Sequence, residues 1–334
     1  MANAIPLLIC DDSSMARKQL IRALPANWPF QISQADNGLS GLDLIRAGKG
    51  EVVLLDLTMP DLDGFGVLAR IREENLQADI IVVSGDVQEE AVRRALALGA
   101  RRFIKKPASP GELEAALLAL GRGVPDNGLA SPAPSSNELP AVSFRDAFRE
   151  IANIAMGRAA QLLGRVLGVF IQLPIPNVNI LEVSELHMAL ADAQGNKRVS
   201  AICQGYIGGG IAGEALLMFH DSDIDDIAQL LNHQPGSSSQ FELQLDLATI
   251  VIGACLNGLS EQLDTPLSSG HPMVLGQHCT IEELIQLNRN RWKRTLAVEI
   301  SYALEDRDIK FDLLLLFSED SVPVLQQKIE FLIN

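Results

Sequence analysis

The sequence predicts an α/β, doubly wound, five-stranded parallel sheet followed by a second domain of α+β type. Two observations support this prediction. Up to residue 121, short apolar runs alternate five times with amphipathic segments of helical period, which is the pattern of strands buried on both faces between covering helices. After residue 142, long helical segments precede groups of strand-like runs, an order typical of α+β domains.

Five strand–helix units make up the first half, which is expected to form a domain over residues 1–121. Because the apolar runs are continuous and each is followed by a helical segment, we expect all the strands to be parallel. The expected strands are 5–10, 30–35, 52–56, 79–84 and 101–105. The expected helices lie near 14–24, 38–47, 64–74, 87–98 and 110–121.

A segment rich in Pro, Gly, Ser and Asn, residues 122–141, shows no periodicity and is expected to be a flexible linker. The second domain is expected over 142–334. Its predicted elements are a long helix at about 143–167, strands near 177–184 and 198–219, a short helix near 222–232, a second long helix at about 241–263, strands near 295–303 and 309–317, and a terminal helix at 321–333. The glycine-rich stretch 208–214 lies between two strand-like runs, so a hairpin turn is favoured over a phosphate-binding loop.

The second domain also contains a weak internal repeat. When Glu150 is aligned with Asp246, Gly157 coincides with Gly253, and a proline and then strands follow each long helix. A repeat of this kind predicts a pseudo-two-fold pair of helices.

Composition excludes several functional classes. The net charge of −15 argues against a nucleic-acid surface, and the basic patch 289–294 is interpreted as a solvated loop or helix end. The N-terminus lacks a basic region, and no stretch approaches about 18 apolar residues, so neither a signal peptide nor a membrane span is expected. The four cysteines and five histidines are scattered without metal spacing, which favours reduced thiols in a cytoplasmic protein.

Polar side chains follow four of the predicted strands. Asp11 and Asp12 end the first strand, Asp56 the third and Ser84 the fourth, and Lys106 follows the fifth. Any one of them alone could be a turn former, but in a doubly wound sheet these strand ends lie at one edge. Three carboxylates there repel one another unless they share a hard cation, and Mg²⁺ prefers oxygen ligands. The set can bind Mg²⁺, hold an anion and offer a carboxylate nucleophile, which is the chemistry of phosphoryl transfer to aspartate.

With these residues, the segment 5–121 resembles the receiver domain of bacterial response regulators, the CheY-like family, whose fold is flavodoxin-like. The matching residues are the pair Asp11-Asp12, Asp56 in "LLDLTMPDLDG", Ser84 and the dipeptide Lys106-Pro107.

The resemblance implies a role for each matching position. Asp56 would be the phosphoacceptor, with a histidine kinase as phosphodonor. Asp12, Asp56 and the carbonyl of Thr58 would bind Mg²⁺ directly, and Asp11 would bind it through water.

The remaining receiver positions concern the phosphoryl group and the response to it. Ser84 and Lys106 would hold the phosphoryl oxygens. Phe103 lies where the family has its aromatic switch residue.

A second polar pattern lies after the linker. Asp146, Glu150 and Asn153 fall at i, i+4 and i+7 and so share one helix face. Such residues are often simply the solvated side of a helix. Together with Pro176 after 22 further residues, however, this pattern resembles the signature of the CheC/CheX/FliY phosphatases, which dephosphorylate CheY-like proteins.

This second resemblance implies that the amide of Asn153 positions a water molecule and that Glu150 pairs with a receiver lysine. Asp146 and Pro176 are interpreted as structural support for the helix. In the second copy of the repeat, the corresponding residues are Asp246, Thr249 and Pro272. Threonine lacks the reach and the amide donor of asparagine, so we expect that site to be weak or inactive.

The expected function is therefore that of a phosphorylated receiver regulating a phosphatase, which removes aspartyl phosphate from its own or a partner's receiver and ends a chemotaxis or two-component signal. The alternative is a non-catalytic module that binds a receiver or a flagellar-motor partner under control of phosphorylation. A transcriptional role is not expected, because no helix-turn-helix or basic surface follows the linker.

Overall fold

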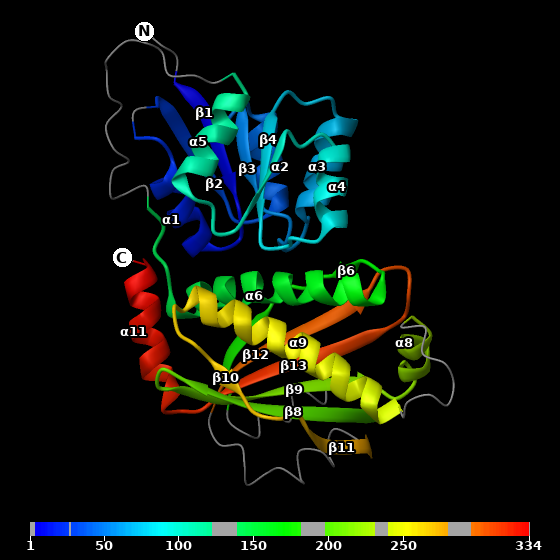
Figure 1. Ribbon diagram of the computed structural model, residues 1–334. Helices are drawn as coiled ribbons and strands as arrows, with labels where there is room; N and C mark the ends of the chain where they lie inside the picture. Colours follow the sequence, from blue (N-terminus) through cyan, green and yellow to red (C-terminus); the bar gives the residue numbers. More distant parts are fainter. Residues whose placement is uncertain are drawn as a thin grey trace. The chain divides into compact units, whose positions relative to one another are not determined.

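The computed structural model describes residues 4–26, 28–121, 139–181, 198–230, 240–279 and 295–333. They belong to two compact units, Met1–Glu150 and Ile151–Asn334 (Figure 1). Most of the predicted linker and the basic patch 289–294 lie outside the described residues.

The first unit contains a five-stranded parallel sheet of order β2-β1-β3-β4-β5, which confirms the predicted parallel arrangement. The central strand β3 is buried along its whole length, and its neighbours β1 and β4 are buried over most of theirs, because they carry apolar side chains on both faces. The strands are β1 Ile5–Cys10, β2 Phe30–Ala35, β3 Val52–Leu55, β4 Asp79–Ser84 and β5 Arg102–Lys105.

Five helices cover this sheet, with α1 and α5 on one face and α2, α3 and α4 on the other (Figure 1). Four of them begin at residues that accept hydrogen bonds from the first turn: Ser13, Asn37, Asp63 and Ser109. Ser109 forms a capping box with Glu112. The helices are α1 Ser14–Ala23, α2 Gly38–Arg46, α3 Gly64–Glu73, α4 Glu89–Ala97 and α5 Pro110–Ala119.

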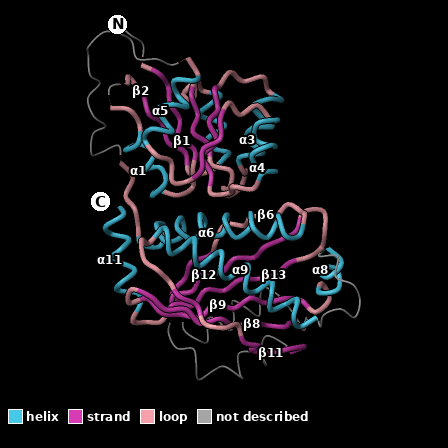
Figure 2. Tube along the Cα trace, viewed as in Figure 1, coloured by secondary structure: helices cyan, strands magenta, loops and turns pink. Residues whose placement is uncertain are grey.

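The second unit is built on an antiparallel sheet, shown in magenta in Figure 2. Its strand order is β10-β8-β9-β13-β12-β6, with β11 paired to β8 and β7 paired to β12. The strands are β6 Ile171–Gln172, β7 Asn177–Leu181, β8 Val199–Gly208, β9 Ile211–His220, β10 Ser268–Ser269, β11 Met273–Cys279, β12 Thr295–Leu304 and β13 Lys310–Phe317. An antiparallel sheet fits the α+β prediction.

The glycine-rich stretch is a hairpin turn, as predicted. Gly209 and Gly210 connect β8 to β9 with φ values of +55° and +81°. This left-handed backbone is accessible to glycine at little cost.

Four helices in the described residues complete the fold after residue 140: α6 Phe144–Leu167, α8 Ile224–Leu230, α9 Gln240–Gln262 and α11 Ser321–Ile333. Helices α6 and α9 are the two long helices of the predicted repeat, and they pack closely. A Cβ placed on Gly258 of α9 would lie 2.7 Å from the Cα of Ala155 on α6. Arg158 of α6 also forms an ion pair with Glu261 of α9.

In the part of the chain that the structure describes, one helical stretch, Glu242–Gln262, is long and apolar enough to cross a bilayer, with a mean hydropathy of 1.4. Of its most apolar window, 61% is buried inside the protein. It therefore has the character of a core helix.

Three cysteines among the described side chains, Cys10, Cys203 and Cys255, are buried and free. Cys10 lies in β1, and the other two lie in β8 and α9. Burial raises the pKa of both Cys10 and Cys255 to about 12.

Candidate functional site

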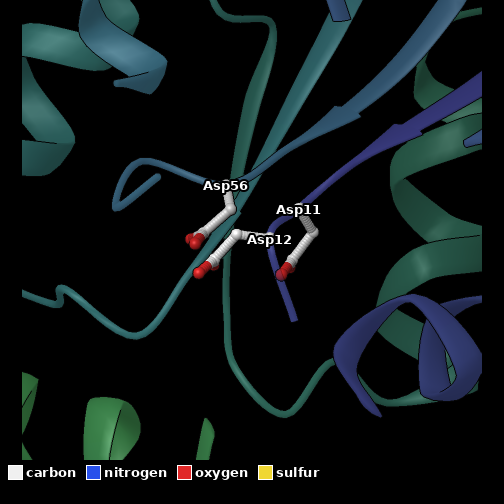
Figure 3. A group of neighbouring side chains, drawn as sticks. All are labelled: Asp11, Asp12 and Asp56. Atoms are coloured by element: carbon white, nitrogen blue, oxygen red, sulfur yellow. The ribbon is translucent and has the colours of Figure 1, made fainter. Parts of the chain in front are cut away.

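Three carboxylates meet at the carboxyl edge of the parallel sheet, as their positions in the sequence predict. Asp11 and Asp12 follow β1 directly, and Asp56 follows the neighbouring strand β3. Figure 3 shows the three side chains projecting from adjoining loops into the same region. One oxygen from each lies within 4.8 Å of the others. The sheet therefore concentrates negative charge at one point.

Lys106 and Ser84 join this edge from the adjacent strands. The ammonium nitrogen of Lys106 lies 2.8 Å from Oδ2 of Asp11 and 3.4 Å from Oδ2 of Asp56. Ser84 is fully buried at the end of β4, and its hydroxyl accepts a hydrogen bond of 3.2 Å from the backbone of Asp86. All five positions predicted from the strand ends thus lie at the same edge.

The first two turns of α6, which belong to the first unit, add three charged side chains to this edge. Oε1 of Glu150 lies 3.1 Å from Nζ of Lys106. The guanidinium of Arg149 lies 3.2 Å from Oδ2 of Asp12 and 3.2 Å from Oδ1 of Asp146.

Asp146 also contacts the beginning of α1. Its Oδ2 accepts hydrogen bonds from the hydroxyl of Ser14 at 2.6 Å and from the backbone N–H of Met15 at 3.1 Å. Asp146 was expected to support its helix and the packing of that helix, and its carboxylate contacts both Arg149 of its own helix and the first turn of α1.

Burial is the largest influence on the pKa values of three carboxylates at this edge, Asp12, Asp56 and Glu150. It raises the pKa of Asp56 well above its usual value, and although Lys106 opposes this rise, Asp11 and Glu150 add to it. Burial likewise raises the pKa of Asp12 to about 6, with Arg149 opposing. The pKa of Glu150 rises to about 7 for the same reason, with Lys106 opposing.

For Lys106 the effect of burial on the pKa has the opposite sign. Burial lowers its pKa, but the surrounding carboxylates, Asp11 first, more than compensate, so that its pKa lies well above the usual value. Lys106 therefore stays charged. Together with Arg149 it supplies two positive charges against the five carboxylates of Asp11, Asp12, Asp56, Asp146 and Glu150.

The donor atoms at this edge suit a hard divalent cation. Oδ1 of Asp56 is buried without a hydrogen-bond partner among the residues that the structure describes, and the buried Oδ2 atoms of Asp11 and Asp56 face the ammonium of Lys106. Carboxylate oxygens gathered at one buried, negatively charged point are the ligands that Mg²⁺ prefers. Thr58, whose carbonyl is the remaining predicted ligand, is half-buried two residues after Asp56.

The other predicted residues differ in exposure. Phe103 is half-buried on β5. Asn153 has only 6% of its surface exposed, and it follows Glu150 by three residues on the continuous helix α6, so the two share a face. Pro176 is buried immediately before β7.

The second copy of the pattern has a different environment. Asp246 and Thr249 are exposed on α9, and the Thr249 hydroxyl donates a 2.8 Å hydrogen bond to the carbonyl of Leu245 in its own helix. Pro272 is half-buried just before β11. The expectation that this copy is weak or inactive stays a prediction.

Sequence reasoning missed Arg149 and Ser14. The available signal for Arg149 was its spacing of three residues from Asp146, which permits an ion pair along a helix. For Ser14 no signal distinguished a contact outside the helix from an ordinary residue of the first turn.

Comparison with known proteins agrees with this geometry. The model of the response regulator receiver domain matches residues 7–118. A probable transcriptional regulatory protein NarL of Mycobacterium tuberculosis is 30% identical over 165 residues, covering 48% of this chain and 73% of that protein. The chemotaxis protein CheY of Treponema pallidum is 33% identical over 103 residues, covering 30% of this chain and 72% of that protein.

A solved structure is similar over a comparable share of the chain. The CheX–CheY–BeF₃–Mg²⁺ complex of Borrelia burgdorferi gives 30% identity and a TM-score of 0.33, covering 34% of this chain and 87% of that chain. The family model covers nearly all of the parallel sheet and of helices α1 to α5. The resemblance of the second domain to the CheC/CheX/FliY phosphatases stays a prediction. The acidic edge, the buried lysine and the matching family model together show that this chain belongs to the response regulators, with a receiver domain at its N-terminus.

Proposed function

We propose that this two-component signalling protein consists of a receiver, residues 1–121, a linker, 122–141, and a phosphatase domain, 142–334. The receiver would accept a phosphoryl group on Asp56. The second domain would hydrolyse aspartyl phosphate on a receiver and so end the signal, as in the CheC/CheX/FliY phosphatases that it resembles. Both reactions would take place in the cytoplasm.

The receiver residues support the first reaction. An oxygen of Asp56 forms a bond to phosphorus while the phosphorus–nitrogen bond of a phosphohistidine on the donor kinase breaks. Ser84 and Lys106 hold the transferred oxygens. Asp12, Asp56 and the Thr58 carbonyl would hold Mg²⁺, with Asp11 acting through water, and the bound ion would neutralise the charge on the phosphoryl oxygens.

The second reaction needs an oriented water molecule. Its oxygen attacks phosphorus, the bond from phosphorus to the Asp56 oxygen breaks, and the products are inorganic phosphate and the free carboxylate. The amide of Asn153 would hold this water in line with the breaking bond. Glu150, by pairing with Lys106, would set the register of the helix, since an ion pair at an interface orients more than it adds affinity.

One observation supports this proposal above the others. Glu150 lies 3.1 Å from Lys106, the pairing that the phosphatase resemblance implies. Phosphorylation of Asp56 would bias the receiver between two states, and that bias would regulate the phosphatase domain.

The test is the decay of aspartyl phosphate after loading with a small acyl phosphate and Mg²⁺. Asn153→Ala is expected to slow phosphate release by tenfold or more, the equivalent of about 1.4 kcal/mol or more in the barrier. Thr249→Ala, at the corresponding place in the repeat, is the matched control and should leave the rate unchanged. Equal decay in wild type and Asn153→Ala would refute the catalytic assignment.

The alternative is a phosphorylation-gated binding module without turnover. The observation that favours it is the second copy, in which exposed Asp246 and Thr249 replace the acid–amide pair. In the same assay, tight binding of a phosphorylated receiver with no release of phosphate would support this alternative.

A further inference from the structure

We infer that Asp146 and Arg149 form a second recognition contact beside Glu150, and that this contact directs the phosphatase helix to the receiver of its own chain. The inference rests on the proposed function, because it names the substrate of that site. Arg149 and Asp146 act here as positioning residues, since neither touches the phosphoacceptor Asp56.

The first part of the contact is electrostatic. Arg149 is placed between two carboxylates, 3.2 Å from Asp12 on the receiver edge and 3.2 Å from Asp146 on its own helix. Asp12 is largely buried, with 10% of its side chain exposed. An ion pair with a buried carboxylate is screened less by salt than an ion pair between exposed groups. The attraction between Arg149 and Asp12 is therefore stronger than that of an ordinary surface pair.

The second part is a helix cap supplied from outside the helix. The first turn of α1 has backbone N–H groups without partners inside the helix. Ser13 satisfies that of Ala16, and Asp146 accepts from that of Met15 and from the hydroxyl of Ser14. A carboxylate at a helix N-terminus is also favoured by the helix dipole.

The three contacts form one complementary pattern. Along α6 the charges are negative at Asp146, positive at Arg149 and negative at Glu150, and their partners are the N-terminus of α1, Asp12 and Lys106. Moving the helix along the edge would bring like charges together, which penalises other registers. The pattern therefore specifies one position of the helix on this receiver.

The residues that make these contacts belong to one compact unit of the chain, Met1–Glu150. Residues 120–143 connect α5 to α6, and a tether of this length raises the effective concentration of one partner near the other to the order of millimolar. Another receiver in solution would have to exceed that concentration to compete. The chain's own receiver is therefore the substrate that the pattern fits.

The experiment measures the lifetime of the Asp56 phosphate in full-length variants. Arg149→Gln and Asp146→Asn should each lengthen it several-fold, and Arg149→Lys should retain most of the wild-type rate because it keeps the charge. Arg158→Gln is the matched control, because Arg158 lies on the same helix with similar exposure and pairs with Glu261 instead. Its lifetime should equal that of wild type. Equal urea midpoints for all variants would exclude unfolding as the cause.

A mixing experiment tests the choice of substrate. Phosphorylated Asn153→Ala chain is mixed with Asp56→Asn chain, which retains Asn153 but cannot be phosphorylated. Action on the own receiver predicts that the mixture decays as slowly as Asn153→Ala alone, and that wild-type decay is independent of protein concentration. Rapid decay in the mixture would overturn the inference.

The two proposals fail in different ways. If Asn153→Ala decays slowly while Arg149→Gln and Asp146→Asn decay like wild type, the recognition contact is refuted and the phosphatase function survives. If Asn153→Ala itself decays like wild type, the phosphatase function fails.

Discussion

Asp86 provides a quantitative test of how burial controls stability in the receiver. It lies in the loop between β4 and α4 with 5% of its surface exposed. Its Oδ1 accepts hydrogen bonds from the backbone and the side-chain amide of Gln88, both at 3.1 Å. Burial nevertheless raises its pKa from 3.8 to about 6, because the two hydrogen bonds favour the charged form less than burial disfavours it.

The rise in pKa converts to a free energy of unfolding. Each pH unit between the unfolded and folded pKa values corresponds to about 1.4 kcal/mol, so the charged form of Asp86 costs about 3 kcal/mol at pH 8. The folded protein binds the proton more tightly than the unfolded chain, so this cost diminishes as the pH falls through 6. It is about half at pH 5 and disappears below 3.8, the unfolded value.

Asp86→Asn removes the charge with little change in volume. We expect this variant to be more stable than wild type by about 3 kcal/mol at pH 8 and by about half of that at pH 5. Comparing the two proteins at each pH cancels the titration of the remaining carboxylates.

The assay is urea unfolding in EDTA, followed by the fluorescence of Trp28, which is buried in the core of the first unit. A Trp292→Phe background leaves Trp28 as the only tryptophan. Asp43→Asn is the control, because Asp43 is exposed and its surface ion pair with Arg46 should contribute little to stability. A difference between Asp86→Asn and wild type that is the same at both pH values, or that has the opposite sign at pH 8, would refute the reasoning.

Three further predictions concern packing, metal binding and capping. Gly258→Ala should destabilise the second unit by about 1–3 kcal/mol, because the new methyl group meets Ala155 across the helix interface. Thermal unfolding monitored by circular dichroism measures the loss of stability, and an unchanged melting temperature would contradict the close packing. Mg²⁺ at 100 times its dissociation constant should stabilise the receiver by about 2.7 kcal/mol, and Asp56→Asn should lose most of this gain in the Trp28 assay. Ser109→Ala should cost the receiver about 1 kcal/mol by removing the cap of α5, and urea unfolding at pH 8 that shows no loss would disprove it.

The sequence predicted the receiver well because its signals are local. Its central strands are apolar on both faces. Ser13, Asn37, Asp63 and Ser109 mark where four of its helices begin. In the second unit the long helices and the glycine hairpin were predicted for the same reason. The short strands β6 and β10 consist of two residues each, too few to produce a periodic pattern, and β11 contains register shifts that obscure its pairing with β8.

In the candidate site, too, the residues with a local sequence signal were predicted and those without one were missed. Placing Asp11, Asp12 and Asp56 together needed only the rule that parallel strand ends meet at one edge. The role of Arg149 depends on which surface the helix faces, and in sequence it resembles any arginine on a solvated helix. A local sequence pattern does not predict the contacts of charged residues whose partners are distant in sequence, such as Arg149 and Asp12.

The buried thiols allow the opening of each unit to be followed chemically. A cysteine whose pKa is about 12 has almost no thiolate at neutral pH, so alkylating reagents react with it only after the surrounding structure opens. Cys10 reports on the receiver, and Cys203 and Cys255 report on the second unit. With Cys279 replaced by serine, pulsed alkylation and mass spectrometry of intact chains would distinguish molecules in which one unit has opened from those in which both have.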